Sequence, residues 1–172
     1  MTLSPAANLP LPRWAYVPGE TDEANADYET LAQVTLLVPS RFQGYVPARH
    51  PALRYGIALN DAGYFWESQE ILEAVWAAAP QGGRERILLR ACIQIANANL
   101  RLRMLKPHAA ARLFGEALGE LDTLSLRQAV AGGHGFADGF PTAPLAALLR
   151  AKLAQPILSK SDWVKIGTAG RT

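Results

Sequence analysis

The residues best suited to chemistry gather in one short segment, YFWESQEILEAVW, at positions 64–76. On a helix, four of its side chains fall within about 80° of one another at the border between the apolar and polar sides; they are Trp66, Gln69, Glu73 and Trp76. Two indoles that bracket a carboxylate and an amide could hold a flat or cationic ligand. A carboxylate half-buried between the rings would have a raised pKa and could serve as an acid or a base.

The longest predicted helix, residues 84–105, carries a second polar stripe. Its polar side chains fall within a helical sector about 80° wide; they are Arg86, Arg90, Gln94, Asn97 and Arg101. Most of the remaining circumference is apolar, so the pattern predicts a central helix that is buried on nearly all sides. The stripe is then either a solvent-facing edge of that helix or a partner for the segment above.

We expect these two polar regions to meet. A half-buried Glu73 needs partners, because an unpaired buried carboxylate is strongly destabilising, and Gln94 with Arg90 or Arg101 would supply them. In the alternative interpretation, Trp76 belongs to the core and Glu73 simply pairs with an arginine of the long helix. The candidate strip comprises Trp66, Gln69, Glu70, Glu73, Trp76, Arg90, Gln94, Asn97 and Arg101.

Metal ligation and nucleophilic catalysis find little support in the sequence. Glu67, Glu70 and Glu73 lie three residues apart, as in carboxylate bundles, but those bundles add Glu-x-x-His pairs, and the three histidines lie outside this helix. We therefore expect an acidic surface face there, with no bound metal and no cofactor. The single cysteine, Cys92, lies on the apolar side of the long helix and is predicted to be a buried structural thiol.

Proline and glycine positions indicate which helices must carry these residues. A short helix is expected at 28–37, core helices at 51–63, 64–79, 84–105 and 107–121, and a last short helix at 144–155. Short links at Gly63 and at Lys106-Pro107 force antiparallel neighbours. The predicted fold is compact and all-α, a bundle of about four core helices packed as two antiparallel hairpins in a tetratricopeptide-like manner.

A chain of 172 residues is long enough for one domain and too short to expect two. We expect a single domain over 1–172 that consists of three parts. They are an irregular N-terminal arm at 1–49, a helical core at 50–122, and a C-terminal part at 123–172 made of a loop, the short helix and a tail.

Aromatic residues near both ends of the chain are expected to fix those ends. Trp14 and Tyr16 would anchor the arm along the body. The tail from Ser159 is expected to be loosely ordered, and Trp163 is either its clamp onto the body or a contact with a second copy. Exposed Trp66 and Trp163, beside a helix that is apolar on most sides, would suit a homodimer interface.

Composition limits the classes of function. Apolar residues make up 49% of the chain, which excludes a disordered protein, and the net charge of +2 is too small to indicate a nucleic-acid or acidic-membrane partner. No apolar run of about 18 residues is uninterrupted, so we expect no membrane span. The N-terminus has no signal pattern, and the expected location is cytoplasmic.

Several segments resemble a bacterial and archaeal family known as domain of unknown function 309. They are YVPGE at 16–20, residues 50–80 and residues 84–114. The family motif is a glycine, two aromatics and Glu-x-His-Glu-x-x-Glu-x-x-Trp, followed by a helix that contains Ile-Gln. The matching residues are Glu67, Glu70, Glu73, Trp76, Ile93 and Gln94. The resemblance implies an all-helical fold and, as the family's name says, no assigned activity.

The chain departs from the family motif at Gln69, where the family has histidine, and at Ala91, where it has glycine. An imidazole can bind a metal or move protons near neutral pH, and an amide can do neither. If family members use the histidine chemically, this chain has lost that step. If the histidine only makes hydrogen bonds in the core, Gln69 can replace it.

Two hypotheses for the function follow. The first is a helical binding or scaffold module whose hairpins present a groove to a peptide or partner protein; the alternative is a small-molecule enzyme that uses the tryptophan, glutamate and glutamine side chains of the strip. The module is favoured because a catalyst needs a matched acid and base, and the family histidine is absent. We expect an unknown protein or small molecule as partner, and neither nucleic acid nor a membrane.

Overall fold

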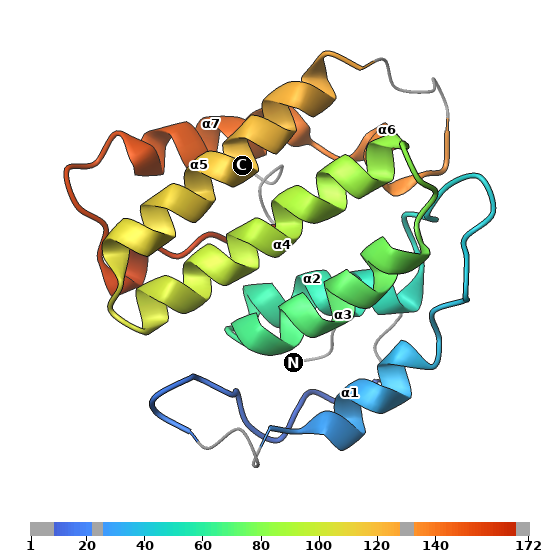
Figure 1. Cartoon of the computed structure of the whole chain (residues 1–172), viewed down its shortest axis with the longest axis horizontal. Helices are drawn as coiled ribbons and strands as arrows, with labels where there is room; N and C mark the ends of the chain where they lie inside the picture. Colours follow the sequence, from blue (N-terminus) through green and yellow to red (C-terminus); the bar gives the residue numbers. More distant parts are fainter. Residues whose placement is uncertain (1–8, 22–25, 128–132, 168–172) are drawn as a thin grey trace.

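The computed structural model describes residues 9–21, 26–127 and 133–167, and within these ranges it contains seven α-helices and no β-strand beyond isolated bridges. The helices are α1 (Tyr28–Thr35), α2 (Pro51–Asp61), α3 (Phe65–Ala78), α4 (Arg84–Arg103), α5 (Pro107–Ser125), α6 (Phe136–Gly139) and α7 (Thr142–Leu153), and a 3-10 helix, η2 (Lys160–Asp162), follows. The predicted all-helical, compact fold is confirmed (Figure 1).

The helix boundaries lie where the sequence provides caps. The side chain of Asp27 accepts the N–H of Thr30 and begins α1, and Nδ1 of His50 accepts the N–H of Ala52 at 3.2 Å and begins α2. Gly63 adopts a φ of 94° in the link between α2 and α3, a conformation that favours glycine. The short α6 was not expected; its first turn is closed by Asp138, which accepts the N–H of Gly135 at 3.0 Å.

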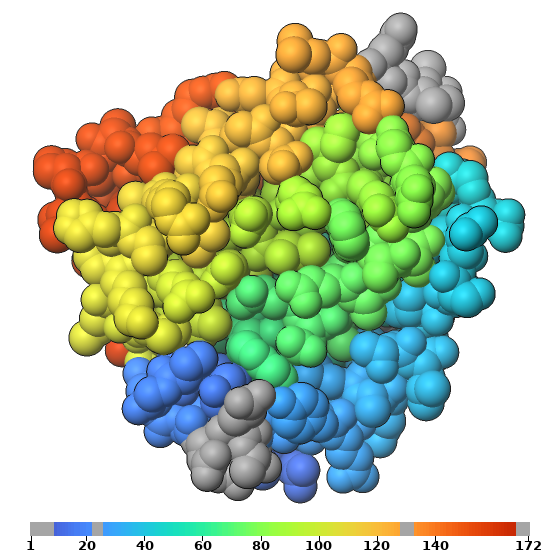
Figure 2. Space-filling model, viewed as in Figure 1, coloured from blue at the N-terminus to red at the C-terminus, as the bar shows by residue number. Residues whose placement is uncertain are grey.

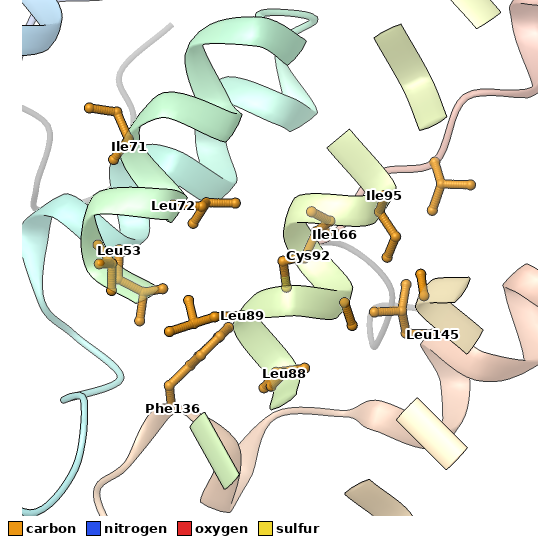
Figure 3. Close-up of a cluster of buried hydrophobic side chains, with 14 of the residues drawn as sticks. Leu53, Ile71, Leu72, Leu88, Leu89, Cys92, Ile95, Phe136, Leu145 and Ile166 are labelled. Carbon is orange, nitrogen blue, oxygen red and sulfur yellow. The ribbon is translucent and has the colours of Figure 1, made fainter. Parts of the chain in front are cut away.

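Helix α4 is the central element, as its apolar circumference predicts. It packs against α3 and α5 and contacts α6 and η2. Figure 3 shows apolar side chains from α2, α3, α6, α7 and the segment after η2 around it: Leu53, Ile71, Leu72, Phe136, Leu145 and Ile166 surround Leu88, Leu89, Cys92 and Ile95 of α4. Cys92 is fully buried, as expected, and burial raises the pKa of its thiol far above the ordinary value.

The N-terminal arm crosses the side of the molecule formed by α1 and α3 (Figure 1). Tyr16 anchors it, as predicted, with its ring centre 5.0 Å from that of Trp66. Val17 packs in a small apolar cluster with Phe65 of α3 and Leu100 of α4. Trp14 is 41% exposed, and the guanidinium of Arg13, from the arm itself, lies 4.8 Å from its ring centre.

The C-terminal tail is well packed, so the expectation of a loosely ordered tail is wrong for residues 159–167. Val164 and Ile166 are each 1% exposed. The ring centre of Trp163 lies 5.3 Å from that of Phe65, so Trp163 clamps the tail onto the body. The physical reason is that polar side chains of α2 and α4 bind the main chain of the tail, which the apolar pattern of the sequence does not reveal.

Helices α2 and α3 approach each other closely at Gly56. A Cβ atom at this position would lie 2.7 Å from Cδ2 of Leu72 and 3.2 Å from Cγ2 of Ile71. The carbonyl oxygen of Gly56 also accepts the hydroxyl of Ser68 at 2.6 Å. The absence of a side chain at Gly56 therefore fixes the distance between the two helices.

Gly56→Ala is expected to lower the free energy of unfolding by about 1–3 kcal/mol, because the added methyl overpacks a closed contact. Gly115→Ala on α5 is the matched control: its Cβ would meet nothing within 4 Å. There the alanine should raise stability by about 0.5–1 kcal/mol, since it only restricts the unfolded chain. Urea denaturation measures both changes, and equal effects at the two sites would contradict the close contact.

Candidate functional site

The candidate strip lies on α3 and α4, which pack against each other and are exposed side by side on one face of the molecule (Figure 2). Two of its residues are exposed, Glu73 and Arg90. The other members are partly buried; they are Trp66, Gln69, Glu70, Trp76, Gln94, Asn97 and Arg101. The stripe of α4 thus borders the solvent, and two of its arginines also contact α3.

Trp76, and not Glu73, joins the two helices of the strip. The guanidinium of Arg86 lies 4.2 Å from the centre of the Trp76 ring, and that of Arg90 lies 5.0 Å from it. Arg86 also donates to the carbonyl oxygens of Ala77 and Ala79, which the end of α3 leaves without helical partners. These contacts fasten the C-terminal end of α3 to α4.

Glu73 does not occupy the predicted position. It is exposed, and within the described ranges it makes no hydrogen bond or ion pair with Gln94, Arg90 or Arg101. The expectation of a half-buried carboxylate between two indoles is wrong. The two indole rings have other partners: arginines of α4 contact Trp76, and the N-terminal arm packs against Trp66.

Trp66 packs against aromatic residues from outside α3. Its ring centre lies 5.0 Å from that of Tyr16 and 5.6 Å from that of Tyr28, and both pairs are edge-to-face. Trp163 is likewise partly buried, against Phe65. The expectation that Trp66 and Trp163 are exposed for a dimer interface is therefore wrong, because both rings are used inside the chain.

Glu67 is the carboxylate that the fold buries, with an exposed fraction of 0%. Its Oε2 accepts the N–H of Tyr16 at 2.7 Å, whereas its Oε1 is enclosed and has no hydrogen-bond partner among the described residues. The expected acidic surface face is therefore wrong at this position. Glu67 lies one and two helical turns before Ile71 and Val75, which are fully buried, so its side chain faces inward.

Asp27, at the start of α1, is a second buried carboxylate, and it has several donors. It accepts the N–H of Arg13 at 2.9 Å and the hydroxyl of Thr30 at 2.8 Å, and the guanidinium of Arg13 lies 3.3 Å from it. Burial alone would raise the pKa of Asp27, but the hydrogen bonds from Arg13 and Thr30 together lower it to about 2. Asp27 therefore stays ionised at neutral pH.

The pKa of Glu67 moves in the opposite direction. Burial raises it, the N–H of Tyr16 opposes this, and the negative charges of Asp27 and Glu70 raise it further. Tyr55 lies close to the same charges: its ring is 1% exposed, and its hydroxyl donates to the carbonyl of Pro10 at 2.6 Å. Burial and the charge of Asp27 raise the pKa of that hydroxyl. We refer to Asp27, Tyr55 and Glu67 as the buried acidic cluster.

This cluster has two properties that acid–base sites share. The pKa values of its two carboxyl groups are shifted in opposite directions. Asp27 therefore stays ionised, whereas Glu67 keeps its proton to a higher pH than usual. The enclosed Oε1 of Glu67 also lacks a donor, and a buried oxygen without one is destabilising. The arm covers the cluster, since Tyr16 and Pro10 supply its partners, so a ligand could reach Glu67 only after the arm moves.

Glu67 is a residue of the family motif but not of the candidate strip predicted from the sequence. A signal was available, because Glu67, Ile71 and Val75 follow the four-residue spacing of a single buried helix face. No such signal marks Asp27 or the hydroxyl of Tyr55, whose partners come from the arm. Among the described residues, no group of three histidine, cysteine, aspartate or glutamate side chains is placed to hold a metal ion.

An open cavity of about 510 Å³ lies between the arm and the end of α4. It is lined by Pro18, Gly19, Glu20, Arg103, Met104, Leu105 and Lys106. No residue of the candidate strip or of the buried acidic cluster lines it. None of the helices in the described ranges is both long enough and apolar enough to cross a membrane.

Fold and site together define an all-helical protein with a motif-bearing helix, α3, placed beside a buried central helix. The family model described as Domain of unknown function (DUF309) matches residues 53–113, from α2 into α5. The match confirms the predicted resemblance to that family over these residues. No curated protein and no solved structure matches the chain significantly.

Glu67→Gln is expected to change the pH dependence of stability. The folded-state pKa of Glu67 lies above its ordinary value of 4.5, so the wild type keeps this contribution below pH 4.5 and loses it as the pH rises through the folded-state pKa. The glutamine cannot ionise, so the stability of the variant relative to the wild type should increase over this window, by at most about 1.4 kcal/mol per pH unit.

Urea denaturation at a series of pH values measures this difference. Glu73→Gln is the matched control, because it makes the same substitution at an exposed position of the same helix. Asp27 titrates near pH 2, outside the window. Parallel profiles for the wild type and Glu67→Gln would show that the fold does not raise the pKa of Glu67.

Proposed function

We propose that the chain is a helical binding module that presents the candidate strip of α3 and α4 to a partner protein. Its core would consist of α2 to α5 as two antiparallel hairpins with tetratricopeptide-like packing. Two features support this arrangement: α2 packs on α3 and α4 on α5, and each pair is joined by a link of three residues, 62–64 and 104–106. Links this short favour antiparallel neighbours.

The observation that carries the proposal is a set of unengaged polar side chains on α3 and α4, beside two fixed indoles of α3. Gln69, Glu73 and Gln94 make no side-chain hydrogen bond or ion pair within the described part of the chain, and the same holds for Asn97 and Arg101. Trp66 and Trp76 are held by the arm and by arginines of α4. Fixed aromatic side chains beside free polar groups are the usual composition of a protein-binding surface.

The dimensions of the strip favour a macromolecular partner over a small molecule. Trp66 and Trp76 are ten residues apart on one helix, which corresponds to about 15 Å along its axis. One small ligand cannot contact both rings and Glu73. Small molecules are usually bound in a concave pocket, and the described cavity is lined by other residues.

Charge reversal tests the module. Glu73→Arg should reduce recovery of the partner protein from the source cell extract by about tenfold or more. The substitution replaces a negative charge that attracts a group of the partner with a positive charge that repels it. Glu116→Arg is the matched control: it makes the same charge change at an exposed position of α5, outside the strip. Quantitative mass spectrometry of chemically cross-linked pull-downs provides the measurement. Equal recovery with both variants, or no specific protein, would contradict the proposed surface.

A small-molecule enzyme is the second candidate, and Glu67 is the observation that favours it. Its carboxyl group holds a proton more readily than usual and has one oxygen without a donor. We place the active site of this enzyme at the buried acidic cluster, which the arm covers, and not at Glu73.

A thermal-shift screen of metabolites separates the two candidates. Under the enzyme alternative, a metabolite should raise the melting temperature of the wild type and of Glu73→Ala but not that of Glu67→Gln. Under the binding-module proposal, no metabolite should distinguish these variants. The homodimer, the cytoplasmic location and the division into arm, core and tail stay predictions, and neither nucleic acid nor a membrane is part of the proposal.

A further inference from the structure

The C-terminal segment 158–167, which we call the strap, is bound through its main chain by three side chains of the helical core. Asn99 of α4 makes two of these bonds with a single residue: its Oδ1 accepts the N–H of Val164 at 2.8 Å, and its Nδ2 donates to the carbonyl of Val164 at 2.8 Å. Asn60 of α2 donates to the same carbonyl at 3.0 Å. The main chain of Val164 is thus fully bonded by side chains.

The third side chain is Asp61, the last residue of α2. Its Oδ1 accepts the N–H of Ile166 at 2.6 Å, and its Oδ2 accepts the N–H of Gly167 at 2.7 Å. Asn60 links the set, because it donates to Asp61 at 3.0 Å and accepts from Asn99 at 2.8 Å. We call Asn60, Asp61 and Asn99 the clasp.

The clasp is complete only when an extended main chain occupies it. Asn60 and Asn99 are both 0% exposed, on helices whose other inward positions are mostly apolar. Without the strap, their amide groups would keep one bond to each other and lose the bonds to Val164. Buried polar groups that lack partners are destabilising, so these two asparagines make the groove selective for a peptide backbone.

The side chains of the strap show which segments fit. Val164 and Ile166 are buried, and Lys165 between them is exposed, which is the alternation of an extended segment. Trp163 lies on Phe65. A Cβ atom at Gly167 would lie 2.7 Å from Oδ2 of Asp61, so a larger residue here would displace the carboxylate that accepts the N–H of Gly167. The groove therefore fits an aromatic residue, an aliphatic residue, any residue, an aliphatic residue and glycine, in that order.

The connection between α7 and the strap makes few contacts that would hold the strap in the groove. Residues 154–157 are all exposed, and the two hydrogen bonds that their N–H groups donate return to α7. Beyond them, Leu158 is buried and Asp162 forms an ion pair with Lys152 of α7 at 3.3 Å. The clasp itself reads main-chain atoms, which any chain can supply.

We propose that the clasp and the groove beside it form a peptide-binding site, which the chain's own strap occupies as an intramolecular ligand. The partner is an extended segment of another protein that carries the strap's pattern, aromatic, aliphatic, any residue, aliphatic, glycine. The strap competes with that segment, because its attachment keeps it at a high effective concentration. This site is separate from the candidate strip and does not depend on the function proposed for it.

The test uses the whole chain with a protease recognition sequence in place of residues 155–157. After cleavage, a fluorescent peptide of residues 158–167 is added, and fluorescence anisotropy follows its exchange with the cut strap. We expect the peptide to bind the cleaved chain and to bind the uncleaved chain at least about tenfold more weakly. Circular dichroism confirms that the cleaved chain keeps its helices.

Matched peptides test the recognition itself. The peptide with Gly167→Ala should bind at least about tenfold more weakly, because its methyl overlaps Asp61. Lys165→Ala should weaken binding much less, because it removes only an exposed side chain that lies over the Trp163 ring of the same peptide. An Asn99→Leu chain should lose binding of the unmodified peptide. Failure of the peptide to bind a cleaved chain that keeps its helices, or equal binding of the Gly167→Ala and Lys165→Ala peptides, would overturn the proposal. Unfolding on cleavage would also overturn it, since the strap would then be an inseparable part of the core.

Discussion

Helix α4 is enclosed along most of its length, and an enclosed helix must find a partner for every polar side chain that its neighbours surround. Asn99 and Glu85 are such residues, 0% and 6% exposed. Asn99 is bonded by Val164, and Glu85 by the backbone of Ala137. Both partners come from segments after α5, outside the part of the chain that matches the family model. The C-terminal third of the chain thus completes a central helix that the family domain alone leaves unsatisfied.

The same requirement explains the N-terminal arm. Glu67 faces the interior from the first turn of α3, and the N–H of Tyr16 is its hydrogen-bond donor. Arm and strap then meet in one apolar cluster, where Val17 and Phe65 pack with Leu100, and Trp163 packs against them. Both ends of the chain are therefore held by side chains of the helical core that bind main-chain groups. The helical core therefore has two surfaces at which its own side chains bind main-chain groups.

The sequence predicts well what is local and periodic. Pro51 and Pro107 mark helix starts, and the apolar circumference of α4 predicts its central position. The candidate site is predicted less well, because its decisive partners are far apart in the chain and have no periodic pattern. Tyr16 lies 51 residues from Glu67, and Val164 lies 65 residues from Asn99. A helical wheel assigns a polar residue to solvent unless an irregular segment covers it, so Glu67 was assigned to a surface that the arm encloses.

The placement of the chain's only cysteine has a practical consequence. Cys92 lies in the middle of α4 with no exposed surface, and burial holds its thiol in the unreactive protonated form. An alkylating reagent can therefore modify it only while the core around α4 is open. Its rate of alkylation in native conditions reports how often the centre of the molecule opens. Cys92 thus serves as an internal probe of local opening at the central helix of the fold.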